Sequence, residues 1–226
     1  MKQTTISPRL LKIASLVPVG ARMVDVGSDH AYLPVHLVQS GRVKEAYATD
    51  VNEGPILRAR ANIEKAGLSD KIRTRRCDGL EGVADFAPDT VTVAGMGGEL
   101  IADIIEKSEY VKAHAPLLIL QPMTQADRLR AYLAENGFSV ISEHLLPEAH
   151  RIYQIIVCRY TAAPSRVLAP LNALIGEKTG QDPHLPLLLE KIKAQYTEIV
   201  KGKRLAGQST AEEEQILKDV TEYETH

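Results

Sequence analysis

The sequence predicts an α/β protein with a doubly wound, mainly parallel sheet that ends in an antiparallel hairpin, followed by a helical tail. Short β-branched segments alternate with helical segments over the first 160 residues, which is typical of parallel strands joined by crossover helices. The last two strand-like segments are joined by only a few residues, too few for a crossover. Beyond residue 160 every segment has a helical pattern.

Seven segments have the composition of buried strands: RMVDVG, EAYATDV, KIRTRRC, DTVTVAG, APLLILQP, FSVISEHLL and RIYQIIVCRY. Four helices are expected between them: LPVHLVQSG, GPILRARANIEKAG, GELIADIIEKS and TQADRLRAYLAENG. Gly41, Gly67 and Gly137 stand where left-handed C-caps are expected. Only PEAH links the last two strands, so this pair is predicted to be antiparallel.

Both ends of the chain are predicted to be helical. Near the start, Ser7 is the expected N-cap and Pro8 the first helical residue. Residues 161–226 are expected to form a helical hairpin, or short antiparallel coiled coil, separate from a domain of residues 1–160. One tail helix places these residues on one face: Leu185, Leu188, Ile192, Tyr196 and Ile199. After Gly207, a capping box of Ser209 and Glu212 is expected to start a second helix, which carries Ile216, Leu217, Val220 and Tyr223.

The composition excludes several classes of protein. No apolar run approaches the roughly 20 residues of a membrane span, and the start of the chain lacks an export signal. A net charge of −2 and 4% aromatic residues argue against a protein that coats nucleic acid, so any such partner must meet local patches. The two cysteines, Cys77 and Cys158, suit neither a metal knuckle nor a disulfide scaffold, and a reducing cytoplasm is the expected setting.

Acidic residues follow three consecutive predicted strands. Asp25 and Gly27 belong to the first strand and turn, where we expect the carboxylate to pair with turn amides and a cationic ligand group. Asp50 ends the second strand, where a carboxylate typically binds ribose hydroxyls. Asp78 ends the third, placed for an adenine amino group. We interpret the three as a nucleoside cradle, although each alone also fits a loop cap.

The turn after the first strand reads GSDHAY and lacks the G-x-G-x-x-G that a dinucleotide requires. Asp29 would repel a diphosphate, whereas an acidic turn suits S-adenosylmethionine, which carries positive charges and no phosphate. A metal site of Asp29, His30, Asp50 and Asp78 is the weaker alternative, because no metal-binding spacing supports it.

Further candidates lie after the fourth and fifth strands. In AGMGG, residues 94–98, the glycines either allow tight packing or open space for a substrate base. Gln121 either hydrogen-bonds that base or is a polar strand end. His30 and Tyr32 are expected to lie within reach of both the cofactor and the substrate base, although a lone histidine more often has a structural role.

The motifs DVGSDHAYLP, ATDVNEGP, CDGL, AGMGGELI, LILQPM and RIYQIIV resemble those of the bacterial tRNA (adenine-N1)-methyltransferase family that modifies adenine 22, the TrmK family. The resemblance implies a Rossmann-like methyltransferase domain, S-adenosylmethionine as donor, tRNA as acceptor and a C-terminal coiled coil that helps to hold the tRNA. Against the wider pattern D-x-G-x-G-x-G, this chain keeps Gly27 but has Asp29 and Ala31 at the later positions.

On this interpretation the catalytic candidates are Asp29, which would hold the N6 amino group, with Tyr32 and Gln121 in support. The donor-binding candidates are Asp25, Gly27, Ser28, Asp29, His30, Asp50, Val51, Asn52, Asp78, Gly79, Gly95, Met96 and Gly97, and no metal site is assigned. The phosphate-binding candidates are Arg73, Arg75, Arg76, Lys191, Lys193, Lys201, Lys203 and Arg204, although such runs are more often solvated faces. A methyltransferase of a small molecule or protein, and a non-catalytic binding module, remain as alternatives.

Overall fold

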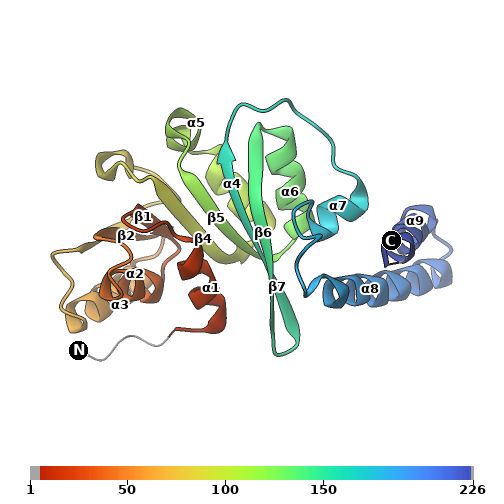
Figure 1. The fold of residues 1–226 in the computed structure, drawn as a ribbon, viewed down its shortest axis with the longest axis horizontal. Helices are drawn as coiled ribbons and strands as arrows, with labels where there is room; N and C mark the ends of the chain where they lie inside the picture. The colour runs from red at the N-terminus through yellow and green to blue at the C-terminus, as the bar shows by residue number, and fades with distance from the viewer. Residues whose placement is uncertain (1–5, 225–226) are drawn as a thin grey trace.

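The computed structural model describes residues 6–224, which form a seven-stranded sheet with helices on both faces and a helical extension at one end (Figure 1). The strands are β1 (Arg22–Val26), β2 (Glu45–Asp50), β3 (Ile72–Arg76), β4 (Thr90–Gly97), β5 (Leu117–Thr124), β6 (Phe138–Glu148) and β7 (Arg151–Tyr160). All seven match the predicted segments.

The order across the sheet is β3-β2-β1-β4-β5-β7-β6. The first five strands are parallel, and β7 runs antiparallel between β5 and β6. The predicted antiparallel hairpin is therefore confirmed. Because parallel strands carry their carboxyl ends to one edge, the turns after β1, β2, β3, β4 and β5 share a rim where a ligand can bind.

The helices that cover the sheet are α1 (Pro8–Leu16), α2 (Tyr32–Gln39), α3 (Glu53–Lys65), α4 (Gly98–Glu106), α5 (Glu109–His114) and α6 (Ala126–Glu135), with a 3-10 turn at Ala84–Phe86. Ser7 caps α1 as predicted, since its hydroxyl accepts a hydrogen bond from the Leu10 amide. The sequence reading missed α5, because six residues are too few to show a helical period.

Two apolar layers enclose the sheet, because successive strand side chains point to opposite faces. Met23 belongs to the layer shared with α1, α2 and α3. Val24 and Val26 belong to the layer shared with α4, α5 and α6. Asp25 lies on the same face of the sheet as Met23. Its side chain is a carboxylate that is nevertheless buried.

The chain beyond Tyr160 is helical, as predicted, and comprises α7 (Pro170–Ile175), α8 (Leu185–Leu205) and α9 (Ala211–Glu224). In Figure 1, α8 and α9 lie beyond α7, away from the sheet. Ion pairs Lys203–Glu213 (2.6 Å) and Lys193–Glu224 (3.0 Å) show that α8 and α9 are antiparallel. The hairpin is confirmed; α7 is an additional helix that the sequence analysis did not separate.

The buried face of the tail differs in part from the prediction. Leu185, Leu188 and Ile192 are buried, whereas Tyr196 and Ile199 are half-buried and Tyr223 is exposed. The second helix begins at Ala211, so Thr210 precedes it directly, and the helix start predicted at Ser209 was one residue too early. No helix in residues 6–224 is long and apolar enough to cross a membrane.

Candidate functional site

The turn after β1 is held tightly to the neighbouring strand. Gly27 has a φ of +68°, and the next amide, that of Ser28, donates to the Thr49 carbonyl on β2 (3.0 Å). Asp29 and Ala31 have φ values of 45° and 55°, a left-handed conformation that normally favours glycine. The two positions that depart from the glycine-rich pattern therefore keep the backbone shape of glycine.

Asp25 is buried below this turn and is satisfied by two hydroxyl groups. Ser28 Oγ donates to Asp25 Oδ2 and Thr92 Oγ1 donates to Asp25 Oδ1, each at 2.6 Å. Thr92 is within reach because it pairs with Asp25 across β1 and β4. The backbone amides of the turn were expected to bind this carboxylate, whereas in the structure these two hydroxyl groups bind it. Burial raises the pKa of the Asp25 carboxyl, and the two hydroxyls and the charge of Arg9 only partly oppose that rise.

Asp29 lies at the mouth of the turn and is half exposed. Its Oδ1 accepts two hydrogen bonds from Arg58 on α3, and its Oδ2 lies 3.4 Å from His30 Nε2. The sequence reading treated Asp29 as an isolated negative charge that would exclude a diphosphate. Because Arg58 balances that charge, the turn is less acidic than expected. The exclusion of a diphosphate ligand therefore rests on the missing glycine pattern instead.

His30 and Tyr32 form a flat aromatic surface beside the turn. Their rings are stacked with centroids 5.0 Å apart and planes 7° from parallel. Asn62 donates to the His30 carbonyl (3.0 Å), which fixes the start of this segment against α3. Tyr32 remains 43% exposed, so the surface is available to a planar ligand.

The end of β2 forms a second part of the rim. Asp50 Oδ1 accepts from the Asn52 amide (2.9 Å), which is the loop-capping arrangement. Val51 is exposed, and its carbonyl accepts from Arg76 Nε (3.1 Å). The Ser28–Thr49 bond joins this loop to the first turn, so the first two acidic positions lie on one connected rim.

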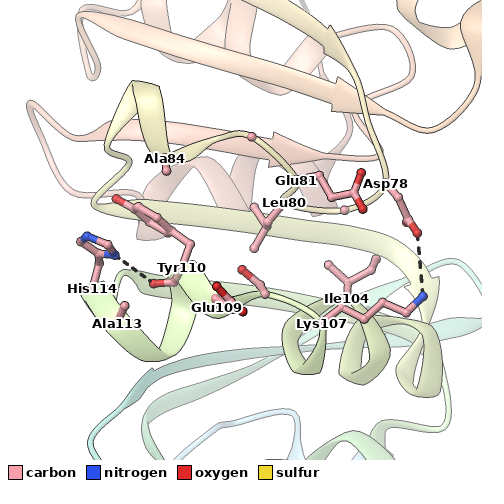
Figure 2. A pocket seen from close by; sticks show the side chains of 13 residues that line it. Asp78, Leu80, Glu81, Ala84, Ile104, Lys107, Glu109, Tyr110, Ala113 and His114 are labelled. Carbon is pink, nitrogen blue, oxygen red and sulfur yellow. Dashed lines mark hydrogen bonds and ion pairs between the residues drawn. The ribbon is translucent and has the colours of Figure 1, made fainter.

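Asp78 faces a different cavity. Figure 2 shows it at one end of a pocket of about 440 Å³ between the β3–β4 loop and the α4–α5 segment, where it lies 3.8 Å from Lys107 Nζ. Gly79 lines the same pocket. Asp25 and Asp29 instead line a hollow of about 230 Å³. Of the three carboxylates in the predicted cradle, Asp25 and Asp78 therefore line different hollows and Asp50 lines neither, and the Asp78 side chain turns toward Lys107 at the end of α4.

The end of β4 closes over the first turn. The methyl group of Met96 occupies the space where a Cβ of Gly27 would stand. Gly95 has a φ of +84°, and the guanidinium of Arg9 lies beside it. The glycines, including Gly97 at the α4 boundary, were expected to leave space for a substrate base. In this structure the side chain of Arg9 lies beside Gly95, and those of Thr124 and Gln125 lie beside Gly97.

Gln121 is fully buried on β5, and both ends of its amide are used within the chain. Its Oε1 accepts from Arg9 Nη1 (2.5 Å) and the Gly95 amide (3.2 Å), and its Nε2 donates to the Pro122 carbonyl (2.8 Å). The expected contact with a base is not available in this arrangement, and Gln121 instead positions Arg9. The sequence analysis missed Arg9, because nothing in its helix indicates that it reaches a residue 112 positions away.

The expected phosphate-binding residues are mostly engaged in ion pairs. Arg75 contacts Asp85 (3.4 Å) and Arg76 lies near Glu53 (3.9 Å). The tail pairs are Lys193–Glu224, Lys201–Glu198, Lys203–Glu213 and Arg204–Glu214. Among the described residues, Lys191 alone of the tail set has no such partner. It lines a groove of about 220 Å³ between the β5–α6 junction and α8, together with Gln125 and Gln195.

Within residues 6–224, no group of three or more histidine, cysteine, aspartate or glutamate side chains is arranged to hold a metal ion. Asp29 and His30 lie together, but Asp78 belongs to the other pocket. The four-ligand site considered from the sequence is therefore not assembled in this structure.

Comparison with known proteins agrees with this geometry. Residues 6–156 match the family model described as a methyltransferase domain. The chain is 32% identical to the tRNA (adenine(22)-N(1))-methyltransferase of Bacillus subtilis, over 98% of this chain and 95% of that protein. The crystal structure of the B. subtilis m1A22 tRNA methyltransferase TrmK is similar with a TM-score of 0.81 and 30% identity, covering 97% of this chain and 96% of that one.

The Streptococcus pneumoniae protein Sp1610, solved in complex with S-adenosyl-L-methionine, has a TM-score of 0.83 and 34% identity, and the match covers 96% of this chain and 99% of that chain. These similarities extend through both the sheet and the helical tail. The fold, the rim at the carboxyl ends of the strands and the full-length match together show that the chain belongs to the tRNA (adenine(22)-N(1))-methyltransferase family.

Proposed function

We propose that this protein transfers a methyl group from S-adenosylmethionine to N1 of adenine 22 in tRNA. The observation that supports the proposal most strongly is the extent of the similarity, which covers 98% of the chain and includes the tail as well as the catalytic sheet. A similarity limited to the sheet would support methyl transfer but not the acceptor. The two free thiols are consistent with a reducing cytoplasm as the place of action.

The donor site in this proposal is the rim formed by the turns after β1 and β2. The buried Asp25 carboxylate sits behind the turn, where it attracts the positive charges of the donor. Asp50, at the end of β2, accepts hydrogen bonds from the ribose. Asp78 contributes to the adenine end only if its side chain leaves Lys107. The other donor-binding residues predicted from the sequence remain part of the proposal because of the family resemblance. They are Gly27, Ser28, Asp29, His30, Val51, Asn52, Gly79, Gly95, Met96 and Gly97.

Catalysis depends on orientation, because the methyl carbon of a sulfonium needs no further activation for an in-line displacement. N1 of adenine is hidden in paired RNA, so the base must leave its stack, at a cost of a few kcal/mol. The stacked His30–Tyr32 surface offers an aromatic face for the extruded base. Asp29 lies next to that surface and accepts a hydrogen bond from the N6 amino group in exchange for part of its contact with Arg58.

The tRNA beyond the target base is held by the tail and the adjoining groove. Lys191 supplies a cation at the groove. The exposed ion pairs of α8 can be exchanged for phosphate contacts at little cost, since such pairs are worth about 0–1 kcal/mol each.

The decisive experiment incubates the full chain with unmodified tRNA transcript and isotope-labelled S-adenosylmethionine, followed by nucleoside analysis. We expect 1-methyladenosine in a transcript with adenine at position 22 and none in a transcript with guanine there. Labelled protein or small molecules without RNA methylation would favour the alternative substrate class. Failure to bind the donor by calorimetry would favour the non-catalytic binding module.

The role of Asp29 is tested with Asp29→Ala and, as a matched control, Arg58→Met, which removes the ion pair but keeps the carboxylate. We expect Asp29→Ala to lower kcat with saturating tRNA, whereas Arg58→Met retains most of it. Full turnover by Asp29→Ala would remove Asp29 from the catalytic set.

A further inference from the structure

The pocket between the β3–β4 loop and the α4–α5 segment extends far beyond the residues that the proposed function uses. Figure 2 shows Asp78 and Lys107 at one end of it and His114, on α5, at the other. The proposed function assigns a role only to the residues at the Asp78 end. The part of the pocket between Glu81 and His114 is therefore open to a second ligand.

Ser108 contributes an unsatisfied hydroxyl group to this part of the pocket. The residue is only 8% exposed, it belongs to the pocket lining, and its Oγ has no hydrogen-bond partner in residues 6–224. Ser108 is the N-cap of α5, yet its side chain makes no capping hydrogen bond. Because a buried hydroxyl without a partner costs free energy, nearly all such groups in proteins are hydrogen-bonded. The unused hydroxyl thus indicates a ligand atom that bonds to it.

The charges that line the pocket determine the sign of that ligand. Glu81 on the β3–β4 loop and Glu109 on α5 are exposed, and neither forms an ion pair within residues 6–224. Lys107 is the one lysine or arginine among the described lining residues, and it pairs with Asp78. The two unpaired carboxylates repel a phosphate and attract an ammonium group. An organic cation therefore fits this pocket, and an RNA backbone does not.

The walls between these charges are apolar and aromatic. Leu80 and Ile104 are buried and line the pocket. The rings of Tyr110 and His114 are stacked with centroids 4.3 Å apart and planes 14° from parallel. The Tyr110 hydroxyl donates to the Pro88 carbonyl (2.9 Å), which holds its ring in place. Apolar side chains accommodate methylene groups, and an aromatic face attracts a cation.

We infer that this pocket binds a linear aliphatic polyamine. Its ammonium groups pair with Glu81 and Glu109, and one N–H donates to Ser108 Oγ, since an ammonium nitrogen has donors only. Its methylene groups cover Leu80 and Ile104. The volume of about 440 Å³ lies in the range of small-molecule sites. The site is separate from the hollow beside the first turn, and the inference does not depend on the proposed function.

The test titrates spermidine into the full chain by calorimetry, without RNA, in the absence and presence of saturating S-adenosylhomocysteine. We expect one spermidine per chain, with the same affinity in both titrations. Butane-1,4-diol is the uncharged comparison compound, and spermidine should bind at least about tenfold more tightly, because its hydrogen bonds are charge-assisted. The affinity for spermidine should fall as salt is added.

Variants identify the residues that bind the polyamine. Glu81→Gln and Glu109→Gln should each weaken spermidine binding by about threefold or more. Asp103→Asn is the matched control, because Asp103 is exposed on α4 but does not line the pocket. Ser108→Ala should also weaken binding without lowering the unfolding temperature, since it removes a buried hydroxyl that has no partner in the chain. A purely structural serine would instead lower that temperature and leave the affinity unchanged.

The remaining outcomes each contradict a defined statement. Absence of spermidine binding, or an affinity equal to that for butane-1,4-diol, overturns the inference. A loss in Asp103→Asn as large as in Glu81→Gln would indicate general charge attraction and also overturns it. So does a weaker affinity in the presence of S-adenosylhomocysteine, which would place spermidine in the donor site. If S-adenosylhomocysteine itself does not bind, the proposed function is contradicted, and the titration of the free chain still tests the pocket.

Discussion

The side chains of Arg130 and Glu143 form a buried ion pair, with Arg130 Nε 2.6 Å from Glu143 Oε1 and exposed fractions of 3% and 2%. Arg130 also donates to the carbonyls of Ala173 and Leu174 in α7, and Glu143 Oε2 accepts from the Lys178 amide (3.0 Å). The pair thus joins α6 and β6 to the tail. These contacts anchor α7 and the start of the segment that leads to α8.

Arg130→Met is expected to lower the free energy of unfolding by about 3–5 kcal/mol, because it leaves the buried Glu143 carboxylate without its cation. The double variant Arg130→Met/Glu143→Leu should recover much of that loss, since no buried charge remains unpaired. Urea unfolding of the wild type, the single variants Arg130→Met and Glu143→Leu, and the double variant measures these changes. A double variant as unstable as the sum of the single changes would show that the contacts to α7, and not the charge, dominate.

Gly98 at the start of α4 is expected to tolerate no side chain, because a Cβ there would overlap the backbone carbonyl of Gln125. Gly98→Ala should therefore destabilise the protein by about 1–3 kcal/mol through local overpacking. Gly202 in α8 is the matched control, since nothing lies within 4 Å of its Cβ position. Gly202→Ala should stabilise the tail by about 0.5–1 kcal/mol. Thermal unfolding should separate the two variants in opposite directions.

Asp25 makes stability dependent on pH in a direction set by its raised pKa. The folded protein binds a proton at Asp25 more tightly than the unfolded chain does, so the contribution of this group to stability is greatest below the ordinary carboxyl pKa. It is lost as pH rises from that value through the raised pKa, by up to about 1.4 kcal/mol per pH unit. Asp25→Asn should remove this slope and weaken donor binding. Urea unfolding at several pH values, with calorimetry at neutral pH, checks both. An unchanged slope in the variant would contradict the assignment.

Lys191 is expected to contact tRNA phosphate, because it borders the groove beside the rim and lacks an ionic partner in residues 6–224. Lys191→Glu should raise the Kd for tRNA by about tenfold or more and lower the slope of log K against log salt by about one. Donor affinity should not change. Lys71→Glu, at the exposed start of β3, is the charge-matched control. Equal losses of tRNA affinity in the two variants would indicate a general charge effect instead.

The sequence alone determined which segments are strands and in which direction they run. The alternation of β-branched and helical segments specifies parallel strands with crossovers, and the short PEAH link permits only an antiparallel pair. The cap at Ser7 and the antiparallel tail were also legible, because both depend on residues close together in the chain. Local hydrogen bonding and hydrophobic period are properties that a sequence displays directly.

The tertiary structure alone decided which side chains meet at the rim. Arg9 and Gln121 come from opposite parts of the chain, Arg58 reaches Asp29 from the neighbouring helix, and Asp78 turns toward Lys107. These contacts depend on how far each helix slides along the sheet and on which rotamer each side chain adopts. Neither the position of a helix along the sheet nor a rotamer produces a periodic pattern or a motif in the sequence. The direction of a charged side chain at the shared edge is therefore known only from the packed structure.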